Sequence, residues 1–210
     1  TVNGFNSLLI LDREPCRPFD RDRAGLNLGE AAAYLVLETE SRARARGAEV
    51  LAVVSGYANT NEAFHATASS PDGTGAYEAM RQALAMARLA PEAISYVNVH
   101  GTGTPNNDAS EGIALNRLFH GAVPPFSSTK SFTGHTLGAA GAVEAVYAVL
   151  AIRHGVHFAN LRWRTPLTEA PLVPVTRTRR DVAVRHVLSS SFGFGGNNTS
   201  LVLSAPDARP

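Results

Sequence analysis

The sequence predicts a single α/β domain over residues 1–210, with helices packed on a mixed sheet. Short apolar runs bounded by turn residues, typical of strands, alternate along much of the chain with segments whose apolar residues recur at helical spacing. Alternation of this kind is typical of layered α/β domains. The composition, with 44% hydrophobic and 18% charged residues, is that of a globular chain.

The first half of the chain contains brief apolar or β-branched runs and two helix-forming segments. The predicted strands are SLLIL (7–11), YLVLE (34–38), VLAVVSGY (50–57) and ISYVNVH (94–100). A polar, helix-prone segment covers residues 40–46 and ends at Gly47. Apolar residues at helical spacing predict a second helix over residues 77–89.

The second half is predicted to continue the alternation. Helices are expected over residues 109–119 and 136–152, and the latter is apolar almost all round, which predicts that it is buried. A weak strand at 124–130 leads into a loop, residues 186–198 run into a glycine-rich turn, and 199–204 form a final strand. The arginine- and proline-containing stretch 154–180 is predicted to be irregular surface.

Charge and cysteine content exclude several classes of protein. A formal net charge of +1 gives no global reason to expect nucleic acid as a partner. No apolar run approaches the ~20 residues of a membrane span, and the first residues lack a signal-peptide layout. With Cys16 as the single cysteine, no intrachain disulfide is possible, and we expect a reducing, cytoplasmic location.

Polar or small residues follow three predicted strands directly. The three segments are His100–Thr104 (HGTGT), Lys130–His135 (KSFTGH) and Phe192–Gly196 (FGFGG). Reactive groups gather at the carboxyl ends of strands in sheets of this kind. One such histidine usually only satisfies backbone groups, but two of them before glycine- and threonine-rich turns indicate a site.

His135 directly precedes the predicted helix 136–152, so the positive end of the helix dipole is expected to disfavour protonation of its imidazole. A neutral imidazole held there can donate an N–H to a developing oxyanion. The other histidines (65, 120, 154, 157 and 186) lack this setting and are interpreted as surface or structural. No histidine pair has metal-ligand spacing, so no metal site is predicted, and the late glycine-rich turn does not fit a nucleotide-binding loop.

These motifs, in this order, carry a resemblance to a known family. The segments are CRPFD (16–20), GLNLGE (25–30), VNVHGTGTPNND (97–108), STKSFTGHTLGAAGAVEA (128–145) and SSSFGFGGNN (189–198). With them the chain resembles the C-terminal half of a β-ketoacyl-acyl carrier protein synthase of the thiolase superfamily, most closely the type II elongating enzymes. The resemblance implies a thiolase-like layered fold and covers nearly the whole chain.

The resemblance also implies roles for individual residues. His100 and His135 match histidines that stabilise the enolate and oxyanion when a malonyl thioester loses CO2 and attacks an acyl thioester, and Lys130 matches an electrostatic, orienting lysine. The supporting positions are Glu144 and Asp108, and the substrate-binding positions are Thr102, Thr104, Phe192, Gly193 and Phe194. The family needs no cofactor, because its substrates ride on the phosphopantetheine of an acyl carrier protein.

The nucleophile of the family is a cysteine in its N-terminal half, which this chain lacks. Cys16 lies in a polar loop between prolines with no helix start after it, so it is not expected to replace that cysteine. We therefore expect a complementary N-terminal half as partner and dimerisation of the complete unit. Two departures from the family pattern, Ala31–Ala33 after Glu30 and Asn197 in the last motif, leave the substrate range open.

Two alternative functions remain open at this stage. A non-catalytic chain-length-factor-like subunit commonly loses active-site residues, whereas both histidines and the lysine are present here. Thiolase-like degradation is disfavoured, because thiolases use a second cysteine and one histidine. The arginines at 177, 179, 180 and 185 are a candidate docking surface for the acidic carrier protein, and the alternative is a merely solvated basic loop.

Overall fold

A five-stranded mixed sheet forms the middle of the computed structural model, which describes residues 1–208. The strand order is β1-β5-β4-β2-β3, with antiparallel β1, β5 and β4, and with β2 parallel to both β4 and β3. The strands are β1 (Val53–Asn61), β2 (Tyr96–Asn98), β3 (Phe126–Ser127), β4 (His186–Gly193) and β5 (Asn197–Ser204).

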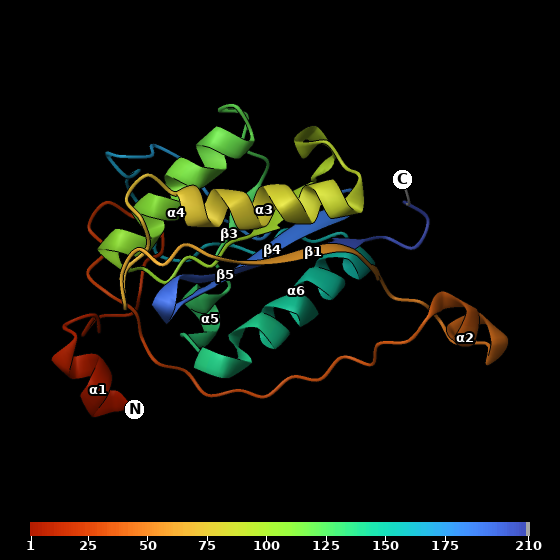
Figure 1. Ribbon diagram of the computed structural model, residues 1–210, viewed down its shortest axis with the longest axis horizontal. Coiled ribbons are helices and arrows are strands. Elements are labelled where there is room, and N and C mark those ends of the chain that lie inside the picture. Colours follow the sequence, from red (N-terminus) through yellow and green to blue (C-terminus); the bar gives the residue numbers. More distant parts are fainter. Residues whose placement is uncertain (209–210) are drawn as a thin grey trace.

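Helices cover both faces of this sheet, as the sequence predicts. In Figure 1, α3 (Thr74–Ala87) and α4 (Pro105–Leu118) lie on one face and α6 (Ala140–His154) lies on the other. The remaining helices are α1 (Val2–Ser7), α2 (Glu40–Ala45) and α5 (Lys130–Thr133), with single turns η1 (Pro91–Ala93), η2 (Leu137–Ala139) and η3 (Phe194–Gly196). The predicted α/β class with a mixed sheet is confirmed.

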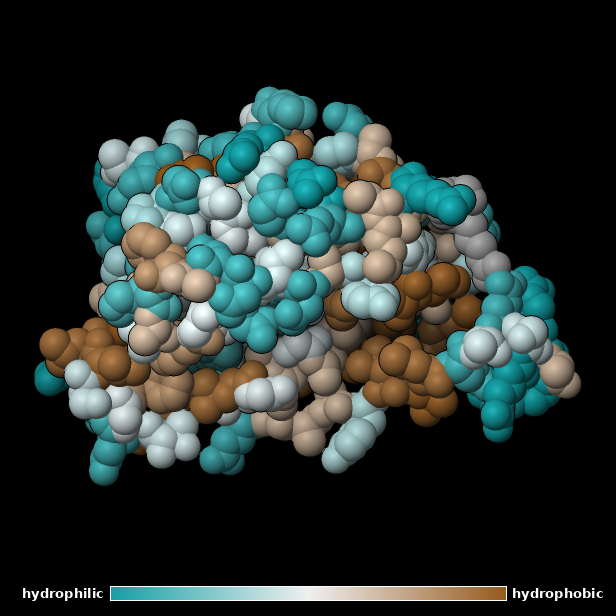
Figure 2. Space-filling view, viewed as in Figure 1, coloured by the Kyte–Doolittle hydropathy of each residue, from teal (hydrophilic) through white to brown (hydrophobic). Residues whose placement is uncertain are grey.

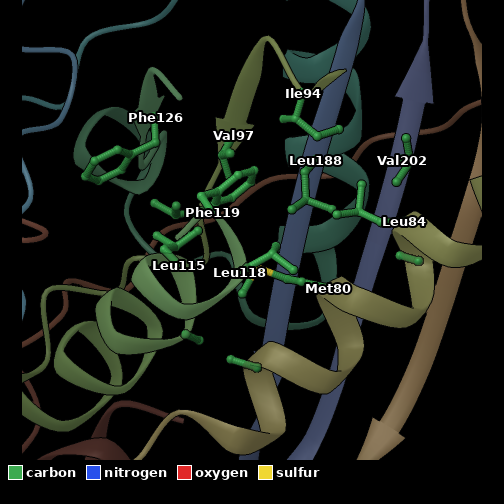
Figure 3. Packing of buried hydrophobic residues seen from close by; sticks show 14 of the residues in the cluster. Met80, Leu84, Ile94, Val97, Leu115, Leu118, Phe119, Phe126, Leu188 and Val202 are labelled. Carbon is green, nitrogen blue, oxygen red and sulfur yellow. The ribbon is translucent and has the colours of Figure 1, made fainter. Parts of the chain in front are cut away.

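The main hydrophobic core lies between the sheet and the α3–α4 layer (Figure 3). In α3 the apolar residues recur at helical spacing, and Ala76, Met80, Ala83 and Leu84 are buried against the strands. Gly56 of β1 allows a close approach of this helix, because a Cβ there would lie 2.3 Å from the carbonyl oxygen of Ala83. A second, smaller cluster on the opposite face packs β2, β4 and β5 against α6.

The α6 helix is buried on one side only, so the prediction of a fully buried helix is wrong for the described chain. Ala145, Ala148 and Ala151 face the sheet, whereas Leu150 is exposed. Within residues 1–208, the stretch 137–154 is the one helical segment long and apolar enough to cross a membrane by length and composition. A helix that packs on a sheet inside a protein meets the same criterion, and α6 does so here.

Two predicted strands do not form. Residue 7 belongs to α1, and Leu11 makes only an isolated bridge with Leu26. Residues 34–38 run as an extended segment below α6 without strand partners among the described residues (Figure 1). Tyr34 is 92% exposed and Val36 87% exposed. A strand needs a neighbouring strand to satisfy its backbone N–H and C=O groups, and no described strand pairs with residues 34–38.

Apolar side chains gather on the same lower side of the molecule. Figure 2 shows hydrophobic surface there, over the α1 end and toward α2. Leu9, Tyr34, Val36 and Leu37 are all more than three-quarters exposed. Apolar side chains exposed in patches of this kind are typical of an interface.

The stretch 154–180 is irregular as predicted, but it is not all surface. Asn160, Leu167 and Val175 are buried, and the Val175 N–H donates to the carbonyl oxygen of Phe126. His157 and His186, interpreted as surface or structural, are buried and lie away from the three strand-end motifs. This stretch therefore covers the β3 edge of the sheet.

The parallel strands explain how three distant motifs meet. β2, β3 and β4 all end at the same edge of the sheet, and His100, Lys130 and Phe192 lie at or just after these ends. Residues after parallel strands converge at the carboxyl edge.

Candidate active site

His100 is held at the end of β2 by a buried carboxylate. Glu111 of α4 accepts the backbone N–H of His100 on Oε1 and that of Gly101 on Oε2, both at 2.8 Å. Gly101 has a positive φ of 38°, and a Cβ there would lie 2.7 Å from the Ser128 side chain. The loop therefore requires glycine at position 101 and the Glu111 carboxylate beneath it. Together they fix the backbone that carries the His100 ring.

Lys130 lies behind His100 in a buried polar network. Its Nζ pairs with Glu144, donates to the His100 carbonyl oxygen at 2.5 Å, and lies 3.3 Å from His100 Nδ1. An ammonium can only donate, so Nδ1 of His100 is the acceptor and the ring proton sits on Nε2. The Lys130 ammonium therefore fixes the tautomer of His100 as well as its position.

His135 is fixed in the same tautomer by its own loop. The backbone N–H of Leu137 donates to His135 Nδ1 at 3.1 Å, so Nε2 carries the proton. The His135 N–H donates to the Asn27 carbonyl oxygen at 2.7 Å, which ties this loop to the GLNLGE segment. The two imidazole rings lie edge to face with centroids 5.4 Å apart. Both present an Nε2–H donor.

Both imidazoles are kept neutral. Burial lowers the pKa of His135 to about 3, and the Lys130 charge adds to this effect. Burial also lowers the pKa of His100 well below its usual range, with further contributions from Lys130 and His135. The predicted neutral state of His135 agrees with this direction, and burial is its main cause. Leu137–Ala139 form a separate turn between His135 and the start of α6 at Ala140.

The two histidines line one large cavity of about 930 Å³. Thr102 and Thr104 line it from the HGTGT loop, and Phe192 and Phe194 line it from the glycine-rich turn after β4. Two neutral N–H donors that face a partly apolar cavity can stabilise an oxyanion, since they are preorganised and largely shielded from water. Within residues 1–208 no group of three or more His, Cys, Asp or Glu side chains is placed to hold a metal ion.

Comparisons with known proteins give the family of this chain. Residues 51–163 match the family model described as "Beta-ketoacyl synthase, C-terminal domain", which is more than half of the chain. The chain belongs to the β-ketoacyl synthase family.

Among curated relatives, this chain is 43% identical over 199 residues to the mitochondrial 3-oxoacyl-[acyl-carrier-protein] synthase of Arabidopsis thaliana. It is 46% identical over 191 residues to 3-oxoacyl-[acyl-carrier-protein] synthase 2 of Rhizobium meliloti. These alignments cover 92% and 89% of this chain but only 43% and 45% of the relatives. The chain thus spans less than half the length of these relatives.

Solved structures give the same fold. The ishigamide ketosynthase/chain length factor matches with a TM-score of 0.92 and 38% identity, over 97% of this chain and 50% of that one. A β-ketoacyl synthase from Burkholderia phymatum matches with a TM-score of 0.91 and 37% identity, over 97% of this chain and 51% of that one. The predicted thiolase-like ketosynthase fold is confirmed.

The site residues predicted from the sequence divide into two groups. Those that line the cavity are His100, His135, Thr102, Thr104, Phe192, Gly193 and Phe194. Lys130, Glu144 and Asp108 are buried outside it. Lys130 and Glu144 are therefore positioning residues, and Asp108 fixes the loop by accepting the backbone N–H groups of Phe19 and Gly103.

Sequence reasoning missed two residues that hold the candidate site together. Glu111 anchors His100, and burial raises the pKa of its carboxyl to about 8 despite the two backbone N–H bonds, which lower it. Asn27 holds the His135 loop through its backbone and the Cys16 N–H through its side chain. A signal for Glu111 was present, because it lies three residues after Asp108 on one face of a helix that otherwise packs in the core.

Cys16 is placed where a nucleophile cannot act. Its side chain is buried, its thiol points to the Lys130 carbonyl oxygen at 3.5 Å, and it does not line the cavity. Burial raises the pKa of the thiol, which disfavours the reactive thiolate. The structure agrees with the expectation that Cys16 is structural.

The arginines at 177, 179, 180 and 185 lie at the end of the sheet opposite to the cavity. Arg185 directly precedes β4, whose other end lines the cavity at Phe192 and Gly193. The eight residues of β4, with a rise of about 3.3 Å per residue, place its first and last residues about 23 Å apart. This separation favours the solvated-loop interpretation over the docking surface.

Proposed function

We propose that this chain supplies the histidine half of a β-ketoacyl-acyl carrier protein synthase that performs decarboxylative Claisen condensation. The observation that carries the proposal is the pair of neutral imidazoles, His100 and His135, which present Nε2–H donors beside one cavity. Hydrogen-bond donors fixed in advance stabilise an oxyanion without reorganisation during the reaction.

The proposed reaction starts with a malonyl thioester on the phosphopantetheine of a carrier protein. Loss of CO2 leaves an enolate, and the Nε2–H groups of His100 and His135 hold its oxygen. The enolate carbon then attacks the carbonyl carbon of an acyl group on a cysteine of the complementary N-terminal half. The resulting oxyanion collapses, the cysteine leaves as thiolate, and a β-ketoacyl thioester remains on the carrier.

The residues around the histidines fit this reaction. Thr102 and Thr104 share a hydroxyl–hydroxyl hydrogen bond of 2.8 Å at the cavity wall, where hydroxyls suit the amides of the phosphopantetheine arm. Phe194 is half exposed and stacks on Phe5 with ring centroids 6.1 Å apart, as suits a gate over an acyl chain. Burial, assisted by the Lys130 ammonium, keeps both imidazoles neutral, and each of them then presents its Nε2–H to the cavity.

Three observations support a complementary half that carries the cysteine. The curated relatives are about twice as long as the matched region, Cys16 is buried away from the cavity, and the extended segment 34–38 exposes apolar side chains. We propose that the missing half pairs with this segment and covers the exposed side of α6. We further propose that the complete unit dimerises and acts in the cytoplasm in fatty acid or polyketide biosynthesis.

The experiment is kinetic and uses the complete enzyme. We expect His135→Ala to slow both malonyl-carrier decarboxylation and condensation, because one oxyanion donor of this kind contributes roughly 10²–10³-fold to the rate. Thr168→Ala, at an exposed position outside the cavity, is the matched control and should leave both rates unchanged. Wild-type decarboxylation by His135→Ala would refute the proposal.

The same experiment tests the chain-length-factor alternative. Ketosynthases in complex with a carrier protein or with a chain length factor are among the similar solved structures. In a chain-length-factor role, His135→Ala would change the length of the product and leave the rate of the first condensation intact. In the proposed catalytic role, His135→Ala would instead slow the first condensation itself.

A further inference from the structure

A second recess, separate from the active-site cavity, is lined by three arginines. It measures about 150 Å³, and its lining residues are Glu14, Pro15, Arg17, Arg162 and Arg164, which we call the arginine recess. This is larger than the about 30 Å³ of a single water in the liquid, so the recess has room for a group of several heavy atoms. None of these residues takes part in the site described above.

The arginines come from two segments that the fold brings together. The Arg162 Nε donates to the Cys16 carbonyl oxygen at 2.8 Å, and the Arg162 Nη2 donates to the Ser131 carbonyl oxygen. Arg162 also has a positive φ of 65°, which is uncommon for a residue with a side chain. Its guanidinium is therefore held in place before any ligand arrives, which lowers the entropic cost of binding.

Several donors of these guanidinium groups have no acceptor among residues 1–208. The Nε of Arg17 is buried and has no hydrogen-bond partner in the described part of the chain. The side chain of Arg164 makes no hydrogen bond or ion pair with any of residues 1–208. A buried donor without an acceptor is costly, and an anion in the recess would relieve that cost.

The charge of the recess matches a phosphate group. Residues 12–17 and 162–164 together carry four arginines and two carboxylates, a net charge of +2. One carboxylate, Asp12, already lies 3.5 Å from Arg17. A phosphate monoester carries about −1.5 to −2 charges at pH 7 and offers three acceptor oxygens, and the planar guanidinium fork suits such oxygens. A carboxylate ligand carries only about half the negative charge of a phosphate monoester.

We propose that the arginine recess binds a phosphate group, either as inorganic phosphate or as the terminal phosphate of a phosphomonoester. The proposed phosphate site lies on the outside of the CRPFD segment, and phosphate binding there does not depend on whether the protein condenses acyl groups. Its connection to the active site runs through Ser131, which follows Lys130 in the chain and whose carbonyl holds Arg162.

The test is a calorimetric titration of the complete protein with inorganic phosphate and with methyl phosphate at low ionic strength. We expect one site with a Kd of about 1 mM or tighter, and binding that weakens steeply with added salt. Equal affinity for the two probes indicates a phosphomonoester as the ligand, and a preference for inorganic phosphate indicates the free ion. Acetate should bind at least tenfold more weakly, and acetate binding of equal strength would overturn the phosphate assignment.

Variants locate the site. Arg164→Gln removes a side chain without protein partners in the described chain and should weaken phosphate binding at least tenfold, whereas Glu14→Gln should tighten it severalfold. Arg180→Gln makes the same change of charge at the far end of the sheet and is the matched control. Phosphate affinity that is unchanged in Arg164→Gln, or equally weakened in Arg180→Gln, would overturn the proposal.

Discussion

Replacement of Lys130 by methionine tests the buried network that supports the two histidines. Methionine keeps the length of the side chain and removes its charge. Lys130 and Glu144 are each only 2% exposed, and the Lys130 Nζ has three acceptors, Glu144 Oε1, the His100 carbonyl oxygen and His100 Nδ1. An ammonium has three donors, so the substitution leaves every one of these acceptors without its partner.

The expected cost is large because the pair is buried. Removal of one partner of a buried ion pair costs about 3–5 kcal/mol in the free energy of unfolding. In a chain of this size about 1 kcal/mol shifts Tm by roughly 2–4 °C, so Lys130→Met should lower Tm by about 6–20 °C. Burial already raises the pKa of Glu144, and Lys130 is its main opposing influence. Without the lysine the carboxyl should take up a proton at neutral pH, and the loss should be greater at high pH.

The assay is urea unfolding of the complete protein as a double-mutant cycle. Glu144→Gln keeps an oxygen for the Ser191 hydroxyl but removes the charge. Added to Lys130→Met, it should recover about 1–3 kcal/mol, because the free-energy cost of burying Glu144 without its partner, whether as a carboxylate or by uptake of a proton, is gone. A Lys130→Met protein within about 0.5 kcal/mol of the wild type, or additive single effects, would refute the reasoning.

Four further outcomes are expected. Lys130→Arg should lower the condensation rate at least ~10-fold, about 1.4 kcal/mol, because a guanidinium is too wide for the lysine site; wild-type rates would contradict this. The depressed pKa of His135, about 3 against an ordinary 6.5, means that the unfolded chain binds the proton first. Stability should therefore fall as pH drops from about 6.5 toward 3, by up to about 1.4 kcal/mol per pH unit, and His135→Gln should remove that part of the slope in pH-dependent unfolding. Mass spectrometry should find no adduct on Cys16 after the folded protein meets an acyl thioester or a thiol reagent, since burial raises the pKa of its thiol. Gly56→Ala should cost about 1–3 kcal/mol in urea unfolding, because its Cβ would lie 2.3 Å from a helix carbonyl, whereas Gly4→Ala meets no atom within 4 Å and should not destabilise.

The exposed segment 34–38 shows where local sequence reasoning fails. Its short apolar run is typical of a strand, and the backbone is extended, but the described chain supplies no strand beside it. The same reasoning predicted a buried helix over residues 136–152, and α6 is buried only on its sheet-facing side. In both cases the composition shows that the segment has apolar side chains that could be buried. Only the fold shows whether another part of the chain packs against them.

The sequence by itself determined the fold class and the residues that meet in the cavity. Alternating apolar runs and helical periodicities depend on local spacing, and the HGTGT, KSFTGH and FGFGG motifs follow strands whose ends must converge in a parallel arrangement. The tertiary structure alone decided how those residues work. It placed Lys130 outside the cavity, made burial the main cause of the low pKa of His135, and brought Glu111 under His100. These properties depend on desolvation and on contacts between residues far apart in the chain, which no local pattern encodes.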